Sequence, residues 1–247
     1  MMRLLAAEAR KAAVTSTNWL LLGISVVLGA LSTTLAVALS DEEGSAMLTD
    51  FKLQEAVHGA SVGALFVVVA GCIGMAGDWR HGQATNAFLT EPRRSRVVAA
   101  RAMVFAGAGA LAGVAASAAA LAAAAVTYQA AGVTFPHDRS AVWLTLAGIT
   151  ASAVLLGILG VALGAVIRNP VIGVVFTLGW FFMFEPIIFG ASTTVARWLP
   201  GMASGGLGRA PAAEVLAPGP AALVLSAIAA AVLVIGTGLL ERSDVNE

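Results

Sequence analysis

Six long apolar runs constrain the fold of this chain more than any other feature of its sequence. A helix needs about 20 apolar residues to cross the roughly 30 Å hydrocarbon core of a bilayer. Each run comes close to or exceeds this length. In lipid each must be helical, because an open sheet edge leaves backbone groups without hydrogen-bond partners. We therefore predict an all-α, polytopic membrane protein with spans at 19–40, 57–76, 102–127, 141–167, 171–189 and 220–240.

The composition agrees with a protein that is solvated mainly by lipid. The 247 residues are 59% hydrophobic and 11% charged, whereas a soluble domain contains about 25% charged residues. The net charge is zero, so we do not expect the chain to bind nucleic acid. We expect a lipid bilayer to surround it. The single Cys72 lies inside an apolar run. It cannot form an internal disulfide, and we interpret it as a packing residue.

The distribution of basic residues predicts the orientation of the spans. Six spans place both ends of the chain on one side, and the side with more Lys and Arg faces the cytoplasm. The tripeptide Ala36-Val37-Ala38 resembles a signal-peptide cleavage site. The apolar run before it is longer than the core of a signal peptide, so we expect no cleavage there. We predict an N-in, C-in topology. The basic residues would then be inside at Arg3, Arg10, Lys11, Arg80, Arg93, Arg94, Arg96, Arg101, Arg168 and Arg242, and outside at Lys52, Arg139, Arg197 and Arg209.

The chain divides into an N-terminal segment, 1–17, and a single transmembrane domain, 18–247. In the first segment Arg3 and Arg10 are seven residues apart and share one helical face. This pattern predicts a short amphipathic helix in the inner interface. A frayed basic tail that only sets the topology is the alternative. The other face of the helix contains Leu5, Ala9 and Ala12.

Pairs of glycines four residues apart occur in three of the runs. Small residues at this spacing let helix backbones approach closely. We expect tight packing within the chain, and the alternative is a face that packs against a second copy. The pairs are Gly59 and Gly63, Gly109 and Gly113, and Gly160 and Gly164.

The inner loop 78–101 is longer than a simple turn and contains signals for secondary structure of its own. Residues 83–89 can form a short helix along the membrane, followed by a new helix start near Pro92. We predict that another protein docks there. The alternative is a basic loop that only sets the topology. This loop also contains a basic cluster, which we expect to contact anionic lipid headgroups. Its members are Arg93, Arg94, Arg96 and Arg101.

The fifth run carries a carboxyl group inside the predicted hydrocarbon. Asn169 and Pro170 suit the N-cap and the first helical position. Counting from this start at 1.5 Å per residue places Glu185 about 21 Å into the membrane. Pro186 predicts a bend or an end of the helix there. Glu185 and Pro186 are candidates for lining or gating a pathway; a proton relay and simple hydrogen bonding to the backbone at the outer mouth are the alternatives. The outer segment 187–219 predicts short re-entrant helices, or else an irregular loop.

Several short motifs follow one another along this plan. They are Asp78-Trp79-Arg80-His81-Gly82, Phe88-Leu89, Pro92, the cluster from Arg93 to Arg96, Glu185-Pro186 and Trp198-Leu199-Pro200-Gly201. In this order and placement they resemble the ABC-2-type ABC transporter permeases, and the resemblance covers nearly the whole chain.

The resemblance implies a six-span, type V exporter-like architecture with an N-terminal amphipathic helix and a coupling helix in the first inner loop. It implies two copies of a separate ATP-binding subunit, which bind ATP and Mg²⁺, and a second permease subunit, identical or homologous. Asp78 stands where the family often has Glu. The docking region implied by position consists of Trp79, Arg80, His81, Gly82, Gln83, Thr85, Phe88 and Leu89.

The sequence motifs agree with a transport subunit that has no ATPase site of its own. Neither lysine, Lys11 or Lys52, follows a phosphate-binding loop of the form G-x-x-x-x-G-K-[ST], so we expect no ATPase activity. No Cys/His cluster predicts a metal site. We expect an exporter of apolar or amphipathic molecules in the bacterial inner (plasma) membrane. The alternatives are a proton-coupled carrier that uses Glu185 and a non-transporting membrane assembly or immunity factor.

Overall fold

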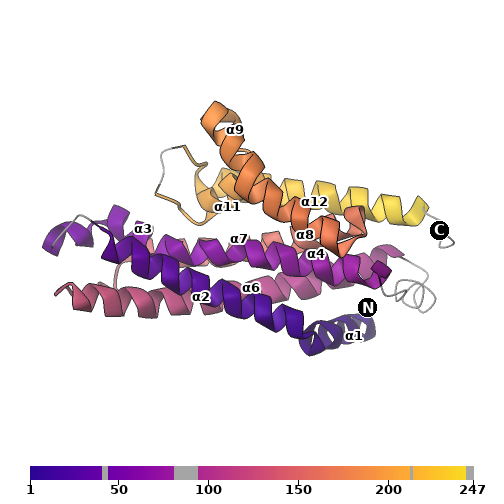
Figure 1. Cartoon of the computed structure of the whole chain (residues 1–247), viewed down its shortest axis with the longest axis horizontal. Coiled ribbons are helices and arrows are strands. Elements are labelled where there is room, and N and C mark those ends of the chain that lie inside the picture. The colour runs from indigo at the N-terminus through magenta and orange to yellow at the C-terminus, as the bar shows by residue number, and fades with distance from the viewer. Residues whose placement is uncertain (41–43, 81–93, 212–213, 243–247) are drawn as a thin grey trace.

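The chain forms a bundle of long helices. The computed structural model describes residues 1–40, 44–80, 94–211 and 214–242, and over these residues it contains helices and turns but no strand (Figure 1). Six helical segments are long and apolar enough to cross a membrane, which confirms the predicted all-α fold and the number of spans. These segments are Ser16–Ala38, Asp50–Asp78, Arg94–Ala130, Ser140–Ile167, Pro170–Ala191 and Pro218–Arg242.

Some of the six segments consist of more than one helical element, and shorter helices lie between them. In chain order the elements are α1 (Met2–Val14), α2 (Ser16–Ala38), η1 (Gly44–Leu48), α3 (Asp50–His58), η2 (Gly59–Gly63), α4 (Ala64–Arg80), α6 (Arg94–Ala130), α7 (Ser140–Ile167), α8 (Pro170–Gly179), η3 (Trp180–Phe184), α9 (Glu185–Ala191), α10 (Thr193–Ala196), α11 (Pro200–Leu207) and α12 (Pro218–Arg242).

Helix α7 is the centre of the bundle. It packs against α4, α6 and α12, while α2 packs against α6 and α8 packs against α4. The short helix α11 packs against α12 and α7. The chain begins at the end of the bundle where α4 and α12 finish, and we call this the N-terminal end (Figure 1). The opposite end, which contains α3, is called the distal end.

The three glycine pairs all lie where helices of this chain cross one another. A Cβ atom on Gly164 would come within 2.6 Å of the Cys72 carbonyl oxygen in α4, and one on Gly113 within 2.8 Å of the Thr150 Cα in α7. Contacts this short leave no room for a side chain, so the backbones themselves touch. The predicted close approach is therefore used inside the chain. The other crowded positions are Gly59 and Gly63 against α2, Gly109 against α7, and Gly160 against α4.

The fifth segment begins as predicted but does not break at its proline. The Asn169 side chain accepts hydrogen bonds from the N–H groups of Val171 and Ile172, at 3.0 and 3.2 Å, and Pro170 lies in the first turn. The predicted bend or end near Glu185 is replaced by the π-helical turn η3, which leads directly into α9. The wider π turn changes the backbone hydrogen-bond register just before Pro186, so the segment accommodates a residue without an N–H group.

Two helices extend further than the apolar runs that predicted them. The third begins at Arg94 rather than 102, and the second begins with α3 at Asp50 rather than 57. Charged residues end an apolar run, but they do not end a helix when their side chains find partners or reach water. Sequence hydropathy therefore located the apolar part of these helices and missed their ends.

The crossing of α6 and α7 gives a first testable prediction. Gly109→Ala should destabilise the protein by about 1–3 kcal/mol, because its new methyl group would push against the backbone of Ala153 in α7. Gly107→Ala is the matched control, because a Cβ there meets nothing within 4 Å. The measurement is thermal unfolding in detergent. Equal midpoints for the two variants would contradict the packing described here.

Candidate functional site

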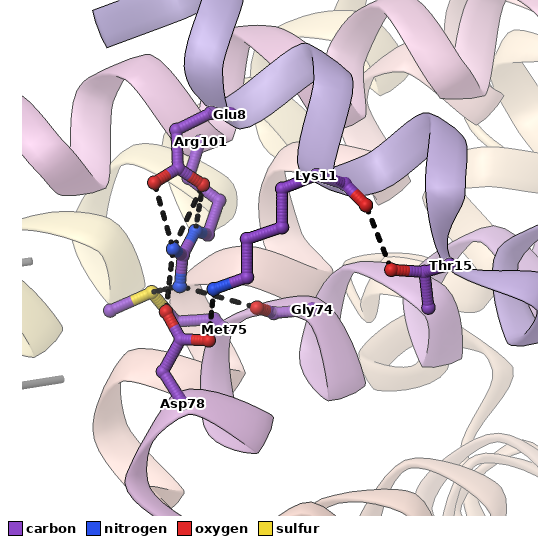
Figure 2. A network of polar contacts seen from close by, with 7 residues as sticks. All are labelled: Glu8, Lys11, Thr15, Gly74, Met75, Asp78 and Arg101. Atoms are coloured by element: carbon purple, nitrogen blue, oxygen red, sulfur yellow. Dashed lines mark hydrogen bonds and ion pairs between the residues drawn. The ribbon is translucent and has the colours of Figure 1, made fainter. Parts of the chain in front are cut away.

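Four charged side chains, two of them buried, form a cluster at the N-terminal end of the bundle. Glu8 and Lys11 come from α1, Asp78 from the end of α4, and Arg101 from the third turn of α6 (Figure 2). Arg101 is 2% exposed and Asp78 is 6% exposed. We call these four residues the ion-pair cluster.

Arg101 is the centre of the ion-pair cluster, and all three of its guanidinium nitrogens have partners. Nε donates to Glu8 at 2.9 Å, and Nη2 reaches both Glu8 at 2.8 Å and Asp78 at 2.7 Å. Nη1 donates to the Gly74 carbonyl at 3.2 Å and contacts the Met75 sulfur at 3.5 Å. A planar guanidinium fits this set of acceptors because its donors have a fixed fork geometry.

The charges within the ion-pair cluster balance. Lys11 Nζ donates to the second oxygen of Asp78, so two cations face two carboxylates. A buried charge is costly unless it is paired and hydrogen-bonded. Each member here has an oppositely charged partner, and Lys11 is the most water-accessible of the four. The arrangement therefore holds α1 against α4 and α6 through charge rather than through apolar packing.

The elbow between α1 and α2 fixes the angle at which α1 meets the bundle. The last carbonyl groups of a helix have no partner within the helix. Here the Thr15 hydroxyl donates to the Lys11 carbonyl at 2.8 Å, and the Asn18 amide donates to the Ala12 carbonyl at 2.9 Å. The Trp19 indole donates to the Ala13 carbonyl at 2.7 Å. These bonds hold α1 in a defined orientation.

The ion-pair cluster lies beside both ends of the predicted docking loop. Asp78 is two residues before the end of α4, and Arg101 is seven residues after the start of α6. The backbone of Trp79 and Arg80 completes the last turn of α4. The remaining predicted docking residues lie outside the described residues: His81, Gly82, Gln83, Thr85, Phe88 and Leu89.

The predicted membrane-surface basic cluster is divided by the structure. Arg101 was expected at lipid headgroups but is buried, because two carboxylates from other helices solvate its charge within the protein. Arg94 donates to the Leu240 carbonyl, and Arg168 donates to the Leu239 carbonyl at 2.8 Å, so both cations meet the last turn of α12. Arg96 is exposed, and Arg93 lies outside the described residues.

Glu185 connects the fifth segment to α11. Its side chain is buried, and Oε1 accepts hydrogen bonds from the Trp180 indole at 2.7 Å and from the Gly201 N–H at 3.0 Å. Gly201 belongs to the first turn of α11, where free N–H groups favour a carboxylate. One alternative from the sequence was that Glu185 forms hydrogen bonds to nearby backbone groups, and the structure contains such a bond to Gly201. Pro186 lies in the first turn of α9.

Sequence reasoning missed Glu8 and Lys11 as members of a site. Their spacing of three residues places them on one face of α1, a signal that the emphasis on Arg3 and Arg10 concealed. Within the part of the chain that the structure describes, no group of His, Cys, Asp or Glu side chains could hold a metal ion.

Comparison with known proteins adds no family assignment. No protein-family model matches this chain, and no curated protein matches its sequence.

The ion-pair cluster predicts strong coupling between α1 and α6. Arg101→Gln should cost about 3–5 kcal/mol of stability, because it leaves two carboxylates buried without their guanidinium partner. Adding Glu8→Gln should recover part of this loss, so the double-mutant cycle, measured by thermal unfolding in detergent, should give an interaction energy above about 1 kcal/mol. Arg139→Gln is the control, because the Arg139–Asp50 pair is exposed and should contribute little. Additive effects of the two cluster substitutions would argue against the pairing.

The Glu185 contacts predict how firmly the segment around α11 is held. Glu185→Leu should speed tryptic cleavage after Arg197 and Arg209 by roughly tenfold, since it removes a hydrogen-bond acceptor worth about 1.5–3 kcal/mol. Glu185→Gln keeps an oxygen that can accept from Gly201 and should resemble the parent. Cleavage rates are measured by mass spectrometry of timed digests. Identical rates for the Leu and Gln variants would show that the carboxylate does not anchor α11.

Proposed function

We propose that this chain is the membrane-spanning permease subunit of an ATP-driven exporter of the ABC-2 type. The observation that carries the proposal is the ion-pair cluster. It joins α1, α4 and α6 close to the end of α4 at Arg80 and about two turns after the start of α6 at Arg94. A partner that pulls or pushes on this loop would move three helices together rather than displace one flexible connection.

The packing of α4 and α6 would transmit such a movement to the rest of the bundle. Both helices meet α7 through backbone contacts: Gly160 lies against Val68 of α4, and Gly157 lies against Phe105 of α6. Contacts between backbones cannot be absorbed by side-chain rearrangement. A displacement at the loop would therefore pass to α7 and, through it, to α12. Movements of this kind, in which packed helices shift between two arrangements, are a common basis of switching.

The proposed assembly contains partners that provide what this chain lacks. Two copies of a separate ATP-binding subunit would dock on the 78–92 loops, with ATP and Mg²⁺ bound on those subunits. A second permease subunit, identical or homologous, would complete the pathway. The N-terminal end, which holds most of the basic residues, would face the cytoplasm of a bacterium, with the chain in the inner membrane. Apolar or amphipathic substrates suit spans with so few charges.

Glu185 has a place in this proposal at the distal end. Its hydrogen bonds link the fifth segment to α11, so a tilt of that segment would also move α11. We propose that Glu185 and Pro186 act in a gate through this link. The same hydrogen bonds favour a role in anchoring over a role as a proton relay.

Docking on the loop gives a direct test of the proposal. Phe88→Asp or Leu89→Asp should prevent complex formation with the ATP-binding subunit and reduce its stimulated ATPase activity by about tenfold or more, as for a buried interface residue. The measurements are co-purification and ATP hydrolysis in reconstituted liposomes. Phe51→Asp is the matched control, because Phe51 is an exposed phenylalanine at the distal end.

Other outcomes would favour the alternative functions. If Phe88→Asp and Leu89→Asp both left the complex and the ATPase activity intact, the docking proposal would fail. Transport by the isolated chain, driven by a pH gradient without ATP, would instead indicate a carrier. Full biological activity with an ATPase-inactive partner would indicate an assembly or immunity factor.

A further inference from the structure

A cavity of about 710 Å³ lies beneath α1 at the N-terminal end of the bundle. Its walls come from α1, α2, α4 and α6. The space exists because small side chains face one another across it, among them Ala9 and Ala12 of α1 and Gly107 and Ala108 of α6. Its walls are almost wholly apolar, and the amide of Asn18, a polar lining residue, is already bonded to the Ala12 carbonyl.

The length of the cavity matches the depth that a lipid tail spans in one leaflet. Along α6 it extends from Met103 to Ala112, which is about 14 Å at 1.5 Å per residue. This is close to the hydrocarbon depth of one leaflet, about 15 Å. The lining is almost wholly apolar, so a polar group that entered the space would find few hydrogen-bond partners there. The space thus suits an extended hydrocarbon chain.

The edge of the cavity carries positive charge. Arg3 and Arg10 on α1 are exposed, and neither forms an ion pair with a described residue. Arg10 lies one helical turn from Ala6 and Ala13, which both line the cavity. A cation at this position can meet a phosphate while the attached hydrocarbon chain enters the space below. The other cation of α1, Lys11, is paired with Asp78 and turns toward the ion-pair cluster instead.

We propose that this cavity binds one acyl chain of an anionic phospholipid from the adjoining leaflet, with the lipid phosphate at Arg10. The lipid then fills the gap between α1 and the bundle, where protein side chains leave space. This site is independent of the proposed transport function, since it depends only on the cavity and on the charges of α1.

Trp19 provides a probe, because its indole lines the cavity. In a variant with Phe at the other tryptophans, the delipidated chain in dodecylmaltoside micelles is titrated with phosphatidylglycerol that carries bromine on its acyl chains. We expect quenching of Trp19 fluorescence to saturate at one lipid per chain. Brominated phosphatidylcholine, and phosphatidylglycerol on Arg10→Gln, should each bind about fivefold more weakly, as expected for one basic residue near an anionic headgroup.

Two alanines on α1 give a matched pair of variants. Ala9→Phe fills the cavity and should abolish the saturable quenching, whereas Ala7→Phe, also exposed but outside the lining, should leave it unchanged. Native mass spectrometry of chains with all their tryptophans provides the second measurement. It should show one retained phosphatidylglycerol in the parent and in Ala7→Phe, and none in Ala9→Phe.

Two results would overturn the proposal. Quenching that rises in proportion to the lipid-to-detergent ratio without saturating, equally in Ala9→Phe and Ala7→Phe, would show that Trp19 senses only bulk lipid. Saturable binding with equal affinity for the two headgroups, unchanged in Arg10→Gln, would refute the anionic phospholipid as the specific occupant.

Discussion

Backbone-to-backbone contact around α7 is the interaction on which the rest of the bundle depends. In lipid, apolar side chains gain little by moving from acyl chains to protein, so helix association needs close van der Waals packing and polar links. Gly157, Gly160 and Gly164 on α7 provide the close packing against α6 and α4. With these three helices held together, α2, α12 and the fifth segment can lie at the periphery with much of their surface exposed.

Polar links then hold the ends of the helices, where the membrane gives way to water. At the N-terminal end, Arg101 joins α1, α4 and α6, while Arg94 and Arg168 bind the last carbonyl groups of α12. Toward the distal end, Glu185 binds the first turn of α11. The His58 ring pairs with the Gly208 carbonyl at 3.1 Å and so links α3 to the end of α11. Charged residues are only 11% of this chain, and Arg94, Arg101 and Arg168 each connect separate helices.

The sequence alone was sufficient for the features that lipid dictates locally. Six spans, all-α structure and the Asn169 cap follow from hydropathy and from the chemistry of single positions. It was insufficient for Arg101, because the Glu8 partner is 93 residues away and no local pattern reveals that two helices will bring them together. The π turn was also missed. The proline rule predicts that a regular helix is interrupted, but it does not say whether the chain bends, stops or changes its hydrogen-bond register.

The π turn sets the direction in which the fifth segment presents its carboxylate. One extra residue in a helical turn rotates everything that follows by about 100° around the axis, since a regular turn contains 3.6 residues. Phe182, Met183 and Phe184 remain exposed on the outside of the bundle, while Glu185, the next residue, is buried against α11. In a strictly α-helical segment with the same residues, this carboxyl group would be rotated by about 100° away from α11. The π turn thus lets one continuous helical segment expose apolar side chains on its outer face while it directs the Glu185 side chain inward.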